Sequence, residues 1–66
     1  MNQLLINGES RTTDAVTLEA LFAELGLSAP LLLVEYNGRA LHRSEWQGIR
    51  LTDGDRLELM SVAAGG

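Results

Sequence analysis

The sequence contains no cysteine and no lysine, and it has a single histidine among its 66 residues. Without cysteine the chain can form neither a disulfide framework nor a thiolate metal site. One histidine also supplies too few nitrogen ligands for a structural zinc ion. The fold must therefore be held together by packing alone.

Clustered positive charge is lacking as well. The basic residues are five arginines spread along the chain, and the formal net charge is −4. A nucleic-acid interface needs basic side chains gathered on one face, so we expect no nucleic-acid partner. An acidic domain favours protein partners with basic docking surfaces, although charge that serves only solubility explains it equally well.

Long apolar runs are absent. The longest, residues 31–34, is far shorter than a membrane-spanning helix. Residues 1–6 lack the basic start and apolar run of a secretory signal. These absences predict no membrane partner and a cytoplasmic location. The short chain predicts one domain, residues 1–66, with residues 63–66 as a flexible tail, and its small core leaves little room for an enclosed catalytic site, so we expect a protein that is not an enzyme.

A β-hairpin is predicted at the start of the chain, because Asn7-Gly8 accepts positive φ between apolar residues 4–6 and an extended segment at 9–13. One helix is predicted over residues 17–25. Thr17 can cap it, Gly26 can end it, and an apolar stripe follows helical spacing. The stripe consists of Leu18, Leu21, Phe22 and Leu25.

The second half of the chain predicts more strands. The expected elements are a central, covered strand at 31–36, a turn at Asn37-Gly38, a short strand at 39–41, a helical turn at 44–47, a turn at 52–55 and a strand at 56–62. We expect an α+β fold of the β-grasp type, with a mixed sheet of four to five strands covered on one face by one helix. The first and last strands are expected to lie side by side and parallel.

The chain ends with side chains no larger than a methyl group, at Ala63, Ala64, Gly65 and Gly66. Such an end can simply be frayed. Alternatively, a slim tail can thread a narrow channel and bring its carboxylate to a nucleotide site in a partner enzyme. A carboxylate is a poor electrophile, so activation as an adenylate would then be required. The absence of lysine prevents side-chain self-acylation by such an adenylate, although an arginine-rich composition alone explains it too.

The sequence resembles the ThiS family of thiamine-biosynthesis sulfur carriers over nearly its whole length. The likeness covers Leu4-Leu5-Ile6-Asn7-Gly8, Val16-Thr17-Leu18, Val34-Glu35-Tyr36-Asn37-Gly38, Arg43 followed three residues later by Trp46, Asp53-Gly54-Asp55-Arg56-Leu57-Glu58 and Gly65-Gly66. The resemblance implies a β-grasp fold and a carrier that binds no cofactor or metal itself. It departs from the family at His42, where proline is common, which predicts a less rigid loop before Trp46.

In that family a ThiF-like adenylyltransferase uses ATP and Mg²⁺ to adenylate the terminal glycine carboxylate. A sulfurtransferase or cysteine desulfurase supplies sulfur from a persulfide, and a ThiG-like thiazole synthase consumes the resulting thiocarboxylate. Carried over, Gly66 is the modified residue, and Ala63, Ala64 and Gly65 thread the partner active site. The alternatives are a carrier for molybdopterin or an amino acid pathway, a ubiquitin-like modifier, and a plain interaction module.

Other residues carry weaker predictions. Met60 and Val62, with Leu5 beside them, are expected to form an apolar docking patch on the open face of the sheet. Trp46 is expected to cap the core with its N–H hydrogen-bonded to backbone or water, or to face a partner. His42 is expected at the surface. The acidic residues Asp53, Asp55 and Glu58 are expected to be solvated rather than to hold a metal.

Overall fold

The computed structural model describes residues 1–27 and 32–61. In chain order the elements are strands β1 (Asn2–Ile6) and β2 (Glu9–Thr13), helix α1 (Leu18–Leu25), strands β3 (Leu32–Tyr36) and β4 (Arg39–Leu41), the 3₁₀ helix η2 (Arg43–Gly48) and strand β5 (Arg56–Ser61). The predicted order of elements is confirmed. The predicted tail at 63–66 lies outside the described residues, so that prediction stays untested.

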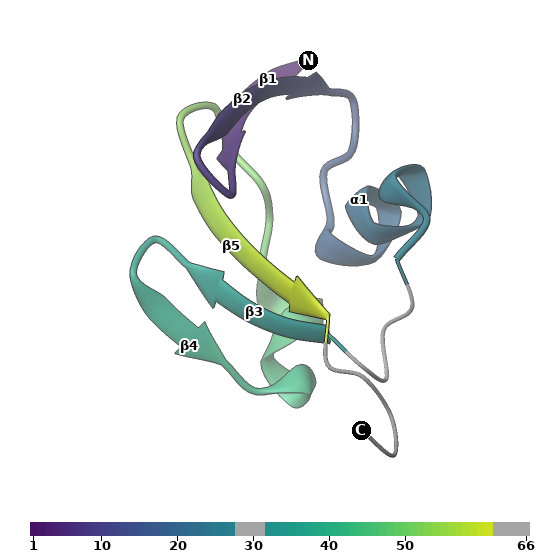
Figure 1. Ribbon diagram of the computed structural model, residues 1–66. Helices are drawn as coiled ribbons and strands as arrows, with labels where there is room; N and C mark the ends of the chain where they lie inside the picture. The colour runs from purple at the N-terminus through teal and green to yellow at the C-terminus, as the bar shows by residue number, and fades with distance from the viewer. Residues whose placement is uncertain (28–31, 62–66) are drawn as a thin grey trace.

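The five strands form one mixed sheet in the order β2-β1-β5-β3-β4, and α1 lies on one side of it (Figure 1). Strands β1 and β5 are parallel, with Leu5 opposite Arg56 and Ile6 opposite Leu57. The other neighbouring pairs, β1–β2, β3–β4 and β3–β5, are antiparallel. The predicted β-grasp arrangement, with the first and last strands side by side, is therefore confirmed.

Local sequence signals fix both ends of α1. The Thr17 hydroxyl accepts a hydrogen bond from the Ala20 N–H at 3.1 Å, and Gly26 ends the helix with a φ of 72°. Of the predicted apolar stripe, Leu18, Leu21 and Phe22 are buried, and Leu25 packs against the same cluster at its edge. The helix covers one face of the sheet, the inner face, because its apolar stripe packs against the apolar side chains of that face.

The core lies between α1, the inner face of the sheet and η2. Its most deeply buried side chains are Leu4, Leu18, Leu21 and Leu57, all under 2% exposed. Each such leucine stabilises the fold by about 2 kcal/mol. At one end, the rings of Phe22 and Trp46 meet edge to face with centroids 5.1 Å apart. None of the helices in the described part of the chain has the length and apolar character needed to cross a membrane.

The prediction that β3 is covered was wrong for one of its two faces. Leu32 and Val34 point into the core, but Leu33 is 58% exposed. The apolar run at 31–34 suggests a strand buried on both sides, but the molecule has one helix to cover the sheet. Alternate side chains of β3 therefore lie on the uncovered side, which we call the open face.

Candidate functional site

The residues predicted to carry the chemistry follow directly after β5. Val62, Ala63, Ala64, Gly65 and Gly66 lie outside the described residues, and their roles stay predictions. The structure describes the strand that leads to them and the surfaces on either side of it. These features make up the surroundings of the end of β5.

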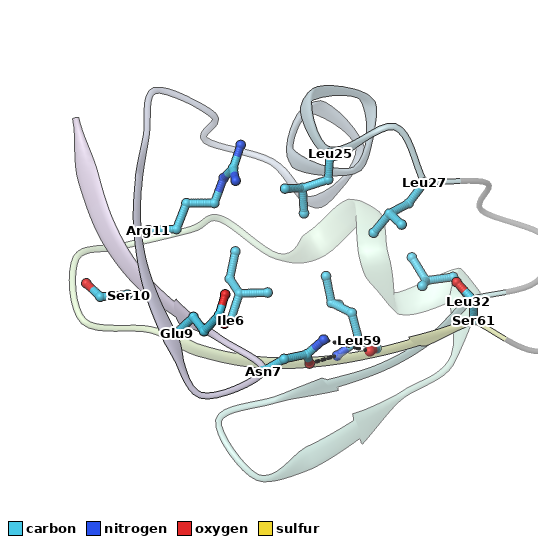
Figure 2. Close-up of a pocket in the computed structure, with 10 residues that line it drawn as sticks. All are labelled: Ile6, Asn7, Glu9, Ser10, Arg11, Leu25, Leu27, Leu32, Leu59 and Ser61. Atoms are coloured by element: carbon cyan, nitrogen blue, oxygen red, sulfur yellow. Dashed lines mark hydrogen bonds between the residues drawn. The ribbon is translucent and has the colours of Figure 1, made fainter.

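One edge of β5 is held by the turn of the first hairpin. The Asn7 backbone N–H donates to the Leu57 carbonyl at 2.9 Å. The Asn7 side chain then binds the Leu59 backbone twice, since its Oδ1 accepts from the N–H at 2.7 Å and its Nδ2 donates to the carbonyl at 3.1 Å (Figure 2). The amide side chain replaces the next residue of a neighbouring strand, so the pairing along β5 extends to Leu59.

The other edge of β5 is held in a related way by the second hairpin. The Asn37 backbone N–H donates to the Arg56 carbonyl at 2.8 Å, and its Oδ1 accepts from the Arg56 N–H at 2.8 Å. Both asparagines have φ near +50°, and each is followed by a glycine with φ above +80°. Two consecutive positive φ angles define the type I′ hairpin turn that favours Asn-Gly. The two turns therefore anchor β5 from opposite sides.

Asp55, at the base of β5, accepts hydrogen bonds at both carboxylate oxygens and is only 7% exposed. Its Oδ2 accepts from the Thr52 N–H and the Tyr36 hydroxyl, each at 2.8 Å. Its Oδ1 accepts from Asn37 Nδ2 at 3.2 Å and from the Thr52 hydroxyl at 3.1 Å. Asp55 thus joins the loop before β5 to β3 and to the second hairpin turn.

The prediction of solvated carboxylates was wrong for Asp55, although Asp53 and Glu58 are exposed as expected. Burial alone would raise the pKa of Asp55, but the hydrogen bonds it accepts outweigh burial and lower the pKa below its ordinary value of 3.8. Burial, followed by the hydrogen bond to Asp55 and its charge, raises the pKa of Tyr36 above 10.0. Near neutral pH the pair is therefore a carboxylate and a neutral phenol, which suits a structural role better than proton transfer.

The open face carries exposed apolar side chains from three strands. Met60 on β5 is 64% exposed, Leu33 on β3 is 58% exposed and Leu5 on β1 is 38% exposed. Leu33 lies directly opposite Met60, whereas Leu5 lies opposite Arg56, four residues earlier on β5. Leu5 and Met60 are thus on the predicted face but not side by side.

Leu33 was missed by the sequence reasoning. Its signal was present, because Leu33 alternates with the core residues Leu32 and Val34 along β3. Combined with the expectation that one helix covers one face, that alternation places Leu33 on the open face. We call Leu33 and Met60 the apolar pair.

A second surface feature beside β5 lies on the helix side of the sheet. A groove of about 420 Å³ opens between the end of α1 and the first hairpin, next to Ser61 (Figure 2). Its apolar lining includes Leu25, Leu27, Leu32 and Leu59, and its polar lining consists of Asn7, Glu9, Ser10, Arg11 and Ser61. It forms because an eight-residue helix covers only part of the inner face, a feature that the sequence pattern did not predict.

The loop before Trp46 is tied by a hydrogen bond. His42 is exposed, as expected, and its backbone N–H donates to Glu45 Oε1 at 2.7 Å. Proline has no N–H and could not make this bond. The hydrogen bond therefore restrains the loop in place of a proline ring. Trp46 is 4% exposed and caps the core rather than facing a partner. Among the described residues, no acceptor lies within hydrogen-bond distance of its indole N–H, so the expected bond to the backbone was not found there.

The described side chains offer no grouping of three or more His, Asp or Glu residues that could hold a metal ion. The histidine, His42, stands at the surface, and Asp55 is occupied by structural hydrogen bonds. What the described residues present instead is an anchored strand, an apolar pair on one side of it and a groove on the other. This arrangement is suited to presenting a chain end to another protein.

Comparison with known proteins agrees with this geometry. The ThiS family profile matches residues 4–66. A thiazole synthase from Paramagnetospirillum magneticum is 38% identical to this chain over 97% of the chain's length. The matched segment is only a fifth of that thiazole synthase. An uncharacterized protein, ycf40, from Trieres chinensis is 31% identical over 92% of this chain and 85% of its own.

Among solved structures, the crystal structure of the thiamine biosynthesis protein ThiS from Geobacter metallireducens superposes with a TM-score of 0.80. The two are 29% identical, and the match covers 97% of this chain and 99% of the other. Sequence and fold therefore agree with the resemblance to ThiS-type sulfur carriers of the β-grasp fold. The chain belongs to the ThiS family.

Proposed function

We propose that this protein is a sulfur carrier for the thiazole branch of thiamine biosynthesis, and that its working group is the carboxylate of Gly66. The observation that carries the proposal is the match to the ThiS family, which runs from residue 4 through the Gly-Gly pair at residue 66. The described structure supports it, because β5, the last strand before that pair in the sequence, is anchored on both sides. Such a stem fixes where the tail leaves the domain.

The carboxylate of Gly66 is converted to a thiocarboxylate in three steps. The Gly66 carboxylate attacks the α-phosphate of ATP, so that an acyl adenylate forms and pyrophosphate leaves. A persulfide sulfur then attacks the acyl carbon, and AMP leaves with the bonding electrons. A thiol finally attacks the donor's sulfur in the resulting sulfur–sulfur bond, so that a disulfide forms between the thiol and the donor, and the thiocarboxylate leaves with the bonding electrons on Gly66. Glycine suits this position because the absence of Cβ leaves both sides of the carbonyl open to attack.

Catalysis is assigned to partner enzymes rather than to this chain. Adenylation requires a ThiF-like adenylyltransferase that binds ATP and Mg²⁺, and the sulfur requires a sulfurtransferase or cysteine desulfurase. A thiazole synthase is proposed as the consumer. This last partner is supported by the thiazole synthase of Paramagnetospirillum magneticum, because a segment similar to this whole domain forms part of that protein.

The proposal is tested by the intact mass of the purified chain after incubation with an adenylyltransferase, Mg-ATP and a persulfide donor. We expect a gain equal to the difference between one sulfur and one oxygen atom, located on Gly66. Omitting ATP should prevent the gain. An unchanged mass in the complete mixture would contradict the carrier function, and covalent attachment of the chain to lysines of other proteins would show a modifier instead.

Substitution of Met60 by aspartate is expected to weaken adenylation with little effect on folding. Met60 is 64% exposed, so a charge there costs the isolated domain little, but it would be buried against a partner that docks on the open face. We expect KM for the chain to rise about tenfold in the adenylation assay. Val16→Asp is the matched control, since Val16 is an exposed apolar residue in the segment before α1. Equal KM values for both variants and the wild type would reject the docking role.

A further inference from the structure

The open face holds two carboxylates directly opposite each other. The register of β3 and β5 pairs Glu35 with Glu58, one position along from the apolar pair of Leu33 and Met60. Both glutamates are exposed, and both point to the same side of the sheet. Side chains directly opposite across antiparallel strands stand about 5 Å apart at Cβ, and like charges placed so destabilise the sheet. We call Glu35 and Glu58 the acidic pair.

The described structure does not neutralise this repulsion with an ion pair. Arg56 lies two residues before Glu58 on the same face and borders the same surface hollow. Yet no arginine of the described residues comes within ion-pair distance of either glutamate. The ion pair that these residues do form joins Arg11 to Glu24 at 3.3 Å, on the helix side of the sheet. We therefore expect the acidic pair to lower the stability of the isolated domain.

The two pairs border one shallow hollow. Its volume is about 290 Å³, and it is lined by Leu33, Met60, Glu35, Glu58 and the small side chain of Ala40 on β4. Ala40 lies opposite Glu35 in the sheet, and its lack of bulk leaves the hollow open beside the carboxylates. The surface thus presents an apolar half next to a negative half.

The charge decides between possible occupants. A second copy of this chain, docked face to face, would bring four carboxylates together, and the net charge of −4 would add to the repulsion. Anionic lipid and nucleic acid are repelled for the same reason. A protein surface that presents an arginine or lysine beside an apolar side chain complements both halves, because the cation would meet the two carboxylates while the apolar group covers Leu33 and Met60.

We infer that the acidic pair and the apolar pair together form the docking site for the adenylating partner, which inserts a cationic side chain between Glu35 and Glu58. This inference rests on the proposed carrier function and names the partner chemistry that its docking needs. The repulsion between the two glutamates is retained in the free domain because a partner's positive charge relieves it. Binding and stability are therefore opposed at these positions.

The test compares Glu35→Gln, Glu58→Gln and the double variant with the wild type in two assays. The midpoint temperature of thermal unfolding of the isolated chain should rise by about 2–4 °C in each single variant, because the like-charge contact is removed. In the adenylation assay, KM for the chain should rise about tenfold in the double variant, and the salt dependence of KM should weaken. Glu9→Gln, an exposed carboxylate on β2, is the matched control and should change neither quantity.

The results separate this inference from the proposed function. If the wild type is adenylated and the double variant keeps the wild-type KM, the docking inference is wrong while the carrier function stands. If the single variants unfold at or below the wild-type temperature, the two glutamates do not destabilise the free domain and the inference is wrong. If the wild-type chain is never adenylated, both fail. A concentration-dependent dimer that the double variant strengthens would identify the face as a self-contact and also overturn the inference.

Discussion

A chain that lacks Gly66 is expected to fold like the full chain and to gain no sulfur. Deletion moves the terminal carboxylate back by one residue, about 3.5 Å along an extended chain. Reacting groups must lie within a narrow range of distance and orientation, and a misplacement of about 1 Å can cost a factor of about 100 in rate. Adenylation should therefore fall at least a hundredfold, which intact mass spectrometry of the reaction products would show.

Two controls make this deletion informative. Ala63→Gly keeps the length of the tail and should still be converted to the thiocarboxylate. Unfolding curves of the deleted and full chains should coincide, because β5 and its hydrogen bonds end at Ser61 in the described structure. In cells without another carrier, only the full-length chain should support growth without added thiamine. Growth on the truncated chain would contradict the role given to Gly66.

The largest effect on stability is expected from the replacement of Asp55 by asparagine. The substitution puts an NH₂ group where one carboxylate oxygen now accepts hydrogen bonds, so that donors from Tyr36, Thr52 or Asn37 lose their acceptor. A buried donor left without a partner costs about 1–3 kcal/mol, and more when the lost acceptor was charged. We expect a loss of about 3 kcal/mol, a large part of the margin of a domain this small. Denaturant unfolding at pH 7 measures it.

The same variant has a predicted pH dependence. The pKa of Asp55 is lowered in the folded state, so between the folded and unfolded values the unfolded chain binds more protons and stability rises with pH. The advantage of the wild type over Asp55→Asn should be complete above about pH 4 and should shrink as pH falls through the folded pKa. Asp53→Asn, an exposed carboxylate in the same loop, is the control. A difference that does not change down to pH 2 would show that charge is not the cause.

The parts of the fold that the sequence predicted correctly depend on local signals. The cap at Thr17, the end at Gly26 and the apolar stripe between them define α1 without any knowledge of the rest of the chain. Asn7-Gly8 and Asn37-Gly38 define the hairpins for the same reason. The parallel pairing of β1 with β5 is not local, but a single helix and a small core leave few other arrangements.

The parts that could not be predicted depend on distant partners. The pattern of the Asp-Gly-Asp turn predicts exposed side chains, and Asp53 is exposed. Asp55, however, is buried and accepts a hydrogen bond from the Tyr36 hydroxyl on a different strand. The hydrogen bonds between the Asn7 side chain and the Leu59 backbone join residues 52 positions apart, and such a contact produces no periodic pattern in the sequence. For the candidate site, the apolar pair was half predicted, since Met60 was identified and Leu33 was not. Residues 62–66 lie outside the described residues, so their roles stay predictions.

When the carboxyl end of this molecule is pulled while the start of β1 is held, the force acts on β5 and on β1 in opposite directions. Because these strands are parallel neighbours, their bridging hydrogen bonds are strained together rather than peeled apart one after another. The Asn7 side chain adds two more bonds to the same line of resistance. We therefore expect the domain to resist a pull between the start of β1 and the end of β5 better than it would if these strands were antiparallel.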